Sequence, residues 1–379
     1  MNRTHTTVFT GCAFSFILVV ILLLQSTVTF AQKKKSASKV RHWNAEISIT
    51  PFYDSNILKY SDKYIQRFLN REDEGRFQIN RYDDMVVRYS AGLSYTSRFI
   101  KKLKTTFSGD LGYYRYSFNN IKNWYRFSFG IRQYFYSKSS FMLSYAYIPH
   151  FYVRHFRDED WIAIYGYTPI TYQPYEFSKD DFSFWIQHYF FKQTSVRVYL
   201  SYYRYFLDKN NTEYDSDDYM AGFRIFHTLN NKIKINGGYK YVYSKAKGFD
   251  QQGETIQTSD DVNATNYSHE YFIGIDYNLP KFFKLKNTVS LDVDYERVFY
   301  TTNHFYEIDP IHAGRHDKNI ELSLSYNISF SKNLDVSAFY SLNTRKTETP
   351  IAANAEYLSD EKSYNEYQTG MQINYNFDF

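Results

Sequence analysis

Cysteine is almost absent from this 379-residue chain, whose single cysteine is Cys12. Cys12 lies in an amino-terminal segment that we expect to be removed, so the mature protein would contain none. A chain without cysteine forms no disulfide and offers no thiolate to a metal ion. Disulfide-rich secreted domains and cysteine-based metal centres are therefore excluded.

The amino terminus has the pattern of an export signal. A short basic start precedes an apolar stretch from Ala13 to Leu24, and a short polar stretch then ends at Ala31. This order predicts a secretory signal peptide at residues 1–31. An uncleaved membrane anchor is the alternative, although the apolar stretch is shorter than the roughly 20 residues that a helical span needs. We expect residues 32–42 to form a short, solvated leader.

Long apolar runs and strong net charge are also missing. No run of 18 apolar residues follows the signal, so no membrane-spanning helix is expected. Lys and Arg number 45 against 40 acidic residues, and losing Arg3 with the signal leaves 44 against 40, a net charge of about +4. This mild charge predicts no nucleic-acid partner. The mature chain contains no phosphate-binding loop, paired-cysteine motif or nucleophile elbow, so we predict no cofactor, no metal site and no enzyme.

Aromatic residues are unusually abundant. They make up 21% of the chain, with 41 tyrosines, although the mean hydropathy is −0.56. A soluble core cannot hide so many rings. A transmembrane β-barrel can place them, because rings gather at both membrane interfaces while half of each strand faces a polar lumen.

Apolar and polar residues alternate with a period of two along the mature chain, as strands require. Fourteen segments carry this alternation, from WNAEISITPFY at Trp43 to YNEYQTGMQINYNFDF at Tyr364. Short polar turns follow the even-numbered segments. Long connections mostly follow the odd-numbered ones, and the longest span 54–84, 157–179, 246–268, 301–318 and 345–363. The sequence therefore predicts an all-β fold, a closed antiparallel transmembrane barrel of about 14 strands (12–16) over residues 43–379, with short periplasmic turns and long external loops.

The final segment, GMQINYNFDF, resembles the carboxy-terminal strand of outer-membrane β-barrel proteins. In that family a terminal Phe with apolar or aromatic residues at alternate positions is recognised by the assembly machinery; the matching positions here are Met371, Ile373, Tyr375, Phe377 and Phe379. The resemblance implies a porin-like protein in the outer membrane of a Gram-negative bacterium, with both termini in the periplasm. It also implies contact with outer-membrane lipid, lipopolysaccharide and the assembly machinery.

The predicted inward faces carry two groups of charge. Basic residues lie on the second to ninth segments: Arg88, Arg126, Arg132, Arg154, Arg197, Arg224, Lys234 and Lys240. Acidic residues lie on the tenth to fourteenth and the first: Glu46, Asp276, Asp292, Asp294, Glu296, Glu321, Asp335 and Glu366. In a closed sheet these groups would form opposing walls and set a transverse field across the lumen, a means by which pores select solutes.

Three functions follow from this arrangement. The first is a passive porin-like channel for small hydrophilic solutes. The second is a non-conducting scaffold, an adhesin or a subunit of an envelope assembly complex. Such a protein would bind another envelope protein, and inward-facing tyrosines would fill its lumen. The third is a hydrolase at the rim, with His150 and His155 near Asp158 and Asp160. No fixed ligand spacing occurs around His304, His312 and His316, so we expect that loop to be solvated.

Overall fold

The computed structural model describes residues 42–378 except 101–102, 136–137, 158, 260 and 281–284. The predicted signal peptide, most of the leader and Phe379 lie outside the described residues. The first strand begins at His42, one residue before the predicted start of the barrel.

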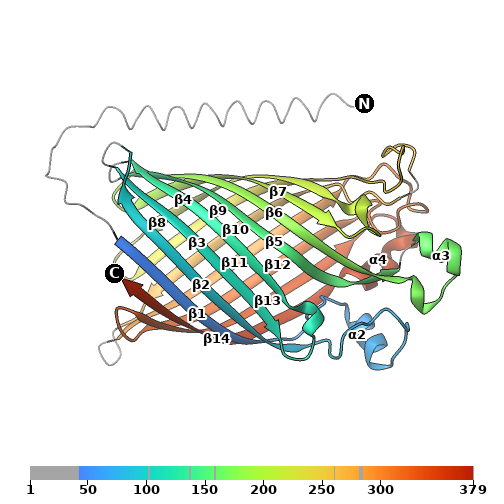
Figure 1. Ribbon diagram of the computed structural model, residues 1–379, viewed down its shortest axis with the longest axis horizontal. Helices are drawn as coiled ribbons and strands as arrows, with labels where there is room; N and C mark the ends of the chain where they lie inside the picture. Colours follow the sequence, from blue (N-terminus) through green and yellow to red (C-terminus); the bar gives the residue numbers. More distant parts are fainter. Residues whose placement is uncertain are drawn as a thin grey trace.

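Fourteen antiparallel strands form one sheet that closes on itself, with β1 paired to β14. The predicted fold class is confirmed: the fourteen strands form a closed antiparallel β-barrel (Figure 1). The strands are β1 (His42–Asp54), β2 (Asp84–Arg98), β3 (Lys104–Tyr116), β4 (Trp124–Phe135), β5 (Ser139–Arg157), β6 (Tyr172–Tyr189), β7 (Thr194–Leu207), β8 (Ser216–Thr228), β9 (Ile233–Ala246), β10 (Asn266–Asn278), β11 (Lys286–Tyr300), β12 (His316–Ser329), β13 (Leu334–Glu348) and β14 (Tyr364–Asp378).

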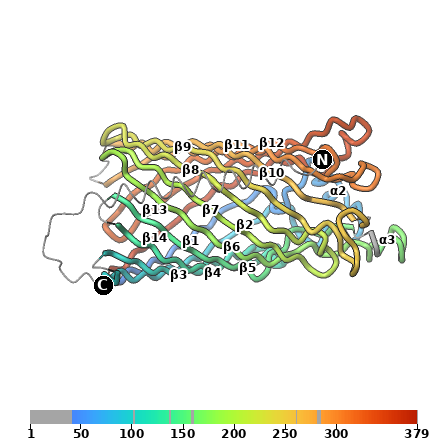
Figure 2. Tube along the Cα trace, turned by 90° about the horizontal axis from the view of Figure 1, so that it is seen from above, coloured from blue at the N-terminus to red at the C-terminus, as the bar shows by residue number. Residues whose placement is uncertain are grey.

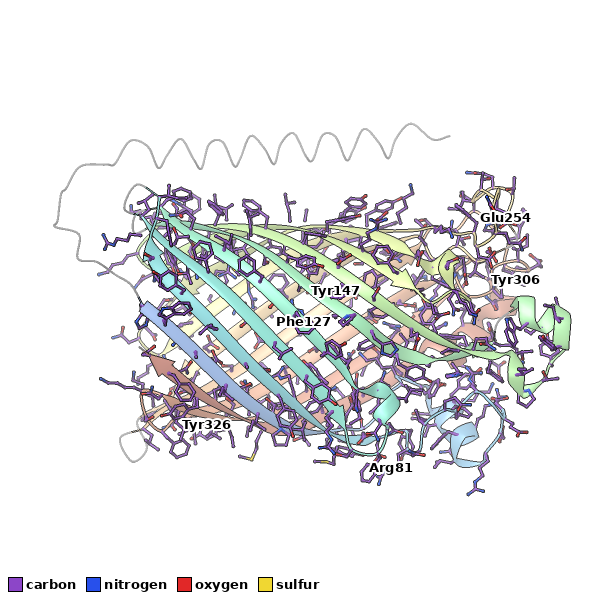
Figure 3. All side chains as sticks on the ribbon, viewed as in Figure 1. Arg81, Phe127, Tyr147, Glu254, Tyr306 and Tyr326 are labelled. Carbon is purple, nitrogen blue, oxygen red and sulfur yellow. The ribbon has the colours of Figure 1, made fainter. Side chains whose placement is uncertain are left out.

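Strand register separates an apolar outer face from a polar inner face. At the closing seam Ile47 lies opposite Tyr375, and both are exposed, whereas Glu46 and Asn376 lie opposite each other one residue away. Because side chains alternate between the two faces of a strand, apolar rings and aliphatic chains cover the outside all round the barrel. Figure 3 shows Phe127 and Tyr326 among these outer side chains.

The long connections gather at one end of the barrel. They carry helices α2 (Asp62–Leu69), α3 (Glu159–Tyr165) and α4 (Ala355–Lys362) and short turns η1 (Asn120–Lys122), η2 (Pro169–Thr171), η3 (Thr212–Tyr214) and η4 (Ala352–Asn354). We call this end the loop end, and the opposite end, where β1 starts and β14 finishes, the turn end (Figures 1 and 2). No helix in the described residues is long and apolar enough to cross a membrane.

The connection between β1 and β2, residues 55–83, folds into the barrel mouth. Its α2 starts at the N-cap Ser61, whose side chain accepts a hydrogen bond from the Tyr64 backbone N–H. Loop residues Ile57, Leu58, Tyr60 and Tyr64 are buried in one apolar cluster. They pack against inward-facing strand residues of the same cluster, namely Phe52, Val86 and Tyr116. The loop therefore lies within the mouth and does not extend into solvent as a free external segment.

Candidate channel lumen

Strand parity places all the residues predicted for the two lumen walls on the inner face. Arg88 illustrates this: it lies opposite Thr50 of β1, and its Nη2 donates to Thr50 Oγ1 at 3.3 Å. The basic residues lie on β2, β4, β5, β7, β8 and β9, and the acidic ones on β10–β14 and β1. Because the sheet is closed, these strands form two opposite arcs of the barrel wall.

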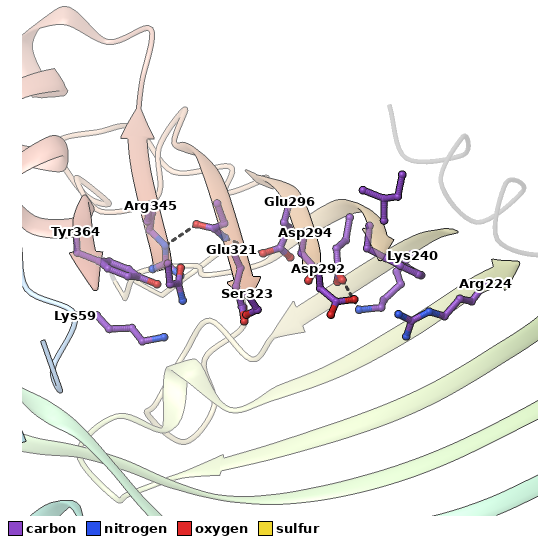
Figure 4. Close-up of a pocket in the computed structure, with 15 residues that line it drawn as sticks. Lys59, Arg224, Lys240, Asp292, Asp294, Glu296, Glu321, Ser323, Arg345 and Tyr364 are labelled. Atoms are coloured by element: carbon purple, nitrogen blue, oxygen red, sulfur yellow. Dashed lines mark hydrogen bonds and ion pairs between the residues drawn. The ribbon is translucent and has the colours of Figure 1, made fainter. Parts of the chain in front are cut away.

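The two arcs meet at the β9–β10 seam, beside a cavity of about 590 Å³ (Figure 4). Arg224 and Lys240 line one side of this cavity, and Asp292, Asp294 and Glu321 line the other. Asp294 lies directly opposite Glu321 in the β11–β12 register. Two neighbouring carboxylates repel each other, so a cation in this part of the lumen would be attracted.

Glu270 belongs to this cavity, and the sequence interpretation missed it. Its Oε1 pairs with Lys240 Nζ, so the basic and acidic arcs neutralise each other in part at the seam. Glu270 sits on β10 with the same parity as the predicted Asp276. The alternation that found Asp276 would therefore have found Glu270 as well.

The walls are more mixed in sign than the two predicted groups. On the acidic side Lys59 and Arg345 also line the large cavity. On the basic side Asp181 of β6 lies 3.9 Å from Arg126 Nη2, beside a second cavity of about 160 Å³. Each wall therefore carries charges of both signs, and neither wall is of one sign along the whole bore.

Arg154 and Glu366 do not line the open lumen, which differs from the role predicted for them. Both are buried at the loop end, beneath the 55–83 connection. Arg154 Nη2 donates to the backbone oxygens of Leu58 and, at 3.2 Å, Lys59. Glu366 Oε2 lies 3.4 Å from Lys59 Nζ. These strand residues therefore hold the loop in the mouth.

A buried ion pair joins the mouth loop to the β13–β14 connection. Arg76 Nη2 lies 3.0 Å from Glu361 Oε2 of α4, and both side chains are only 9% exposed. The guanidinium carbon of Arg76 also lies 3.8 Å from the centre of the Tyr64 ring, whose hydroxyl donates to Glu361. Burial alone would raise the pKa of Glu361, but the charges of Arg76, Lys362 and Arg154 and the hydrogen bond from Tyr64 together lower it. We call Tyr64, Arg76 and Glu361 the mouth latch.

Lys122, in η1, is a second buried charge at the loop end. Its Nζ donates to the Tyr152 backbone oxygen at 2.8 Å, and the residue is only 5% exposed. Burial, reinforced by the positive charge of Arg154, lowers the pKa of Lys122 to about 7.

The expectation of a solvated histidine loop between β11 and β12 is wrong for its second half, whereas the first half, with Phe305, is exposed. His312 and Asp309 are buried, and His312 Nδ1 lies 2.9 Å from Asp309 Oδ1. Nearby, Arg315 Nη2 lies 2.6 Å from Asp317 Oδ2, also buried. Burial lowers the pKa of His312, more than offsetting the opposing effect of its hydrogen bond to Asp309. The loop is a folded structural unit.

The rim positions considered for hydrolysis hold no described His–Asp pair. His155 Nδ1 is hydrogen-bonded to the Tyr152 hydroxyl at 2.8 Å. His150 Nε2 lies 2.7 Å from Glu176 Oε2. Asp158 and the side chain of Asp160 lie outside the described part of the chain. In a hydrolytic triad a carboxylate orients the histidine, whereas the partner of His155 here is the Tyr152 hydroxyl.

Another acidic cluster lies in the β9–β10 connection at the loop end, where Figure 3 labels Glu254. Carboxylate oxygens of Asp250, Glu254 and Asp261 lie within 4.8 Å of one another. Ser259 Oγ lies within hydrogen-bond distance of both Glu254 Oε2 (3.2 Å) and Asp261 Oδ2 (3.0 Å). Ser259 thus bridges two of the three carboxylates.

Comparison with known proteins gives structural likeness only. No protein-family model matches the chain. No curated protein matches it either. Among solved structures it is similar to the outer-membrane channel DcaP of Acinetobacter baumannii (12% identity, TM-score 0.44, covering 92% of this chain and 100% of that one). It is also similar to a bacterial polysaccharide outer membrane secretin (8% identity, TM-score 0.42, covering 88% of this chain and 98% of that one). A third similar structure is an anion-selective porin from Comamonas acidovorans (11% identity, TM-score 0.40, covering 90% of this chain and 100% of that one).

Proposed function

We propose that this protein is a passive, porin-like channel for small hydrophilic solutes in the outer membrane, with a charged lumen and a mouth that the 55–83 loop narrows. The observation that carries the proposal is the cavity of about 590 Å³ between the basic and acidic arcs. Opposite charges that face each other across a bore with low-dielectric walls orient water and dipolar solutes and disfavour apolar ones.

The orientation in the membrane forms part of the proposal. Both ends of the barrel sequence lie at the turn end, which we assign to the periplasm, and the loop end would face outward. The outer face would contact lipid and lipopolysaccharide. The last strand, with Met371, Ile373, Tyr375 and Phe377 on its outer face, would be read by the assembly machinery.

Conductance tests the proposal. The purified protein in planar bilayers should show discrete conductance steps. Replacing Arg88 and Arg126 together by Gln should shift ion selectivity toward cations, because both line the basic arc. A folded barrel that never conducts would remove the channel function.

A scaffold or adhesin function remains the second candidate, and exposed apolar residues on one outer connection favour it. Around α3, Ile164, Tyr167 and Ile170 are exposed, Tyr167 by 77%. Exposed apolar patches often mark interaction sites. This patch lies on the β5–β6 connection, whereas Ile57, Leu58, Tyr60 and Tyr64 of the 55–83 loop are buried in the mouth. Co-purification of an envelope protein that is lost on replacing Ile164 and Tyr167 by Ser, in a barrel without conductance, would favour this function.

A further inference from the structure

Three inward arginines form a line across β4, β7 and β8 without acidic partners. In the described part of the chain, Arg132, Arg197 and Arg224 form no ion pair, whereas Arg126 and Lys240 on the same arc do. Arg197 and Arg224 even lie directly opposite each other in the β7–β8 register. Like charges opposite each other destabilise a sheet, so this arrangement costs stability unless a negative group binds there.

Amide side chains hold two of these guanidinium groups in place. Arg197 Nη2 donates to Gln187 Oε1 at 2.8 Å, and Arg224 Nε donates to Asn236 Oδ1 at 2.8 Å. A carboxylate at either position would give a stronger hydrogen bond but would neutralise the charge. An uncharged amide partner orients the guanidinium group without neutralising its charge. The guanidinium N–H groups that do not contact the amide remain available as donors to a ligand.

Aromatic rings alternate with the arginines. The Trp185 ring lies 4.8 Å from the guanidinium carbon of Arg132 and 4.4 Å from that of Arg197. The Phe226 ring lies 5.1 Å from Arg197 and 5.4 Å from Arg224. Because Arg132 and Arg197 both contact the Trp185 ring, their guanidinium carbons lie within roughly 9 Å of each other.

The backbone makes room for the last ring of the series. Phe272 of β10 lies 5.0 Å from the guanidinium carbon of Arg224 and reaches across Gly238 of β9. A Cβ on Gly238 would meet Phe272 Cζ at 2.6 Å. The glycine is thus needed for the ring to reach the arginine.

We propose that this ladder of Arg132, Trp185, Arg197, Phe226 and Arg224 binds small organic anions that join a carboxylate to an apolar body, such as aromatic carboxylates. The guanidinium N–H groups would donate hydrogen bonds to the carboxylate, and Trp185 and Phe226 would contact the apolar body. An inorganic anion would use only the charges. The inference rests on the proposed function in that solutes must reach the lumen, and it names the class of solute that this arc favours.

Isothermal titration of the folded protein in detergent micelles tests the site without requiring conduction. The probes are benzoate, the neutral benzyl alcohol, and acetate, which has no ring. Benzoate should bind more tightly than either. Arg197→Gln should weaken benzoate binding by about 10- to 100-fold, because it removes a charged hydrogen bond. Trp185→Leu should weaken benzoate binding and leave acetate binding unchanged.

Arg204→Gln is the matched control, because it removes the same charge from the outward face of the same strand, where Arg204 Nε lies 3.5 Å from Asp217. Arg197→Lys keeps the charge but not the planar fork, and should lose part of the affinity. If Arg197→Gln does not fold, benzoate binding by Arg197→Lys and Trp185→Leu tests the inference instead. Benzoate binding no tighter than that of benzyl alcohol, or equal losses in the Arg197 and Arg204 variants, would overturn the inference. A barrel that binds benzoate but never conducts would instead overturn the proposed function alone.

Discussion

Removing Glu361 should release the loop that narrows the mouth. In Glu361→Ala, Arg76 loses its buried carboxylate partner and the Tyr64 hydroxyl loses its acceptor. Breaking a buried ion pair by removing one partner costs about 3–5 kcal/mol, because the other charge stays desolvated. If that cost falls on the docked loop alone, the ratio of released to docked loop rises by about 10²- to 10⁴-fold.

Two measurements on the folded barrel report this ratio. Amide hydrogen exchange of α2, residues 62–69, should accelerate by the same factor, because exchange follows local opening. Trypsin should cleave after Lys63 and Arg67 in the variant while the strands stay intact. In bilayers, the channel should also spend more time in its widest state.

The neighbouring residue supplies the control. Asp360→Ala removes an exposed pair, since Asp360 Oδ2 lies 2.5 Å from Lys63 Nζ, which is 53% exposed. Exposed pairs contribute about 0.2–1 kcal/mol, so exchange should change by fivefold or less. The double variant Arg76→Met with Glu361→Leu should restore protection, because apolar side chains can replace a buried pair. Equal acceleration in Asp360→Ala and Glu361→Ala would refute the latch.

Two further predictions concern charge. Burial lowers the pKa of Lys122 to about 7 in the folded protein, against an ordinary value of 10.5. Between these pH values the unfolded chain binds more protons than the folded one. The free energy of unfolding should therefore rise with pH across this window, by up to about 5 kcal/mol. Urea titrations at pH 7 and pH 10 should show a smaller rise in Lys122→Met than in the exposed-site control Lys346→Met, and an unchanged rise would contradict the burial of the charge. Asp292→Asn with Asp294→Asn should shift the reversal potential in a KCl gradient toward anion selectivity, because both carboxylates line the large cavity. Asp217→Asn on the outward face of β8 should leave it unchanged, and equal shifts would show that the lumen is not the conducting path.

The barrel could be predicted from sequence because its main signal is one-dimensional. Alternation with a period of two decides which side chains face lipid, and it needs no knowledge of distant residues. It weakens where strands extend beyond the membrane. The sequence assigned residues 157–179 to a connection, but strand β6 already starts at Tyr172. Its first part, YQPYEFSK, is hard to recognise because it contains a proline and because Tyr175 and Phe177 are out of phase with Phe182 and Phe184 of the next segment. In a segment outside hydrocarbon, neither face has to be apolar.

The mouth could not be predicted in the same way. Arg76 and Glu361 are separated by 285 residues, and nothing in either local pattern indicates the other. A partial signal did exist: Ile57, Leu58 and Tyr60 are more apolar than a solvated loop requires, and they are the residues buried in the mouth. The same reasoning applies to His312, whose partner Asp309 lies only three residues away but whose burial depends on the packing of several connections.

Closure of the barrel depends on a close backbone approach at the β1–β14 seam. Gly370 lies opposite Phe52, and a Cβ on it would meet Phe52 Cβ at 2.4 Å and the Pro51 backbone oxygen at 2.5 Å. Gly112 of β3 also faces inward, but a Cβ there would meet nothing within 4 Å. Gly370→Ala should force the two strands apart and lower the free energy of unfolding by about 1–3 kcal/mol, whereas Gly112→Ala should be neutral or stabilising by about 0.4–1 kcal/mol.

Urea unfolding in micelles, followed by the electrophoretic mobility of the unheated barrel, compares the two glycine variants. Because unpaired strand edges are not tolerated in hydrocarbon, a weakened seam should convert directly into loss of the compact form. Equal urea midpoints for Gly370→Ala and Gly112→Ala would mean that β1 and β14 do not approach as closely as Phe52 and Gly370 do here, and that closure is set elsewhere in the sheet.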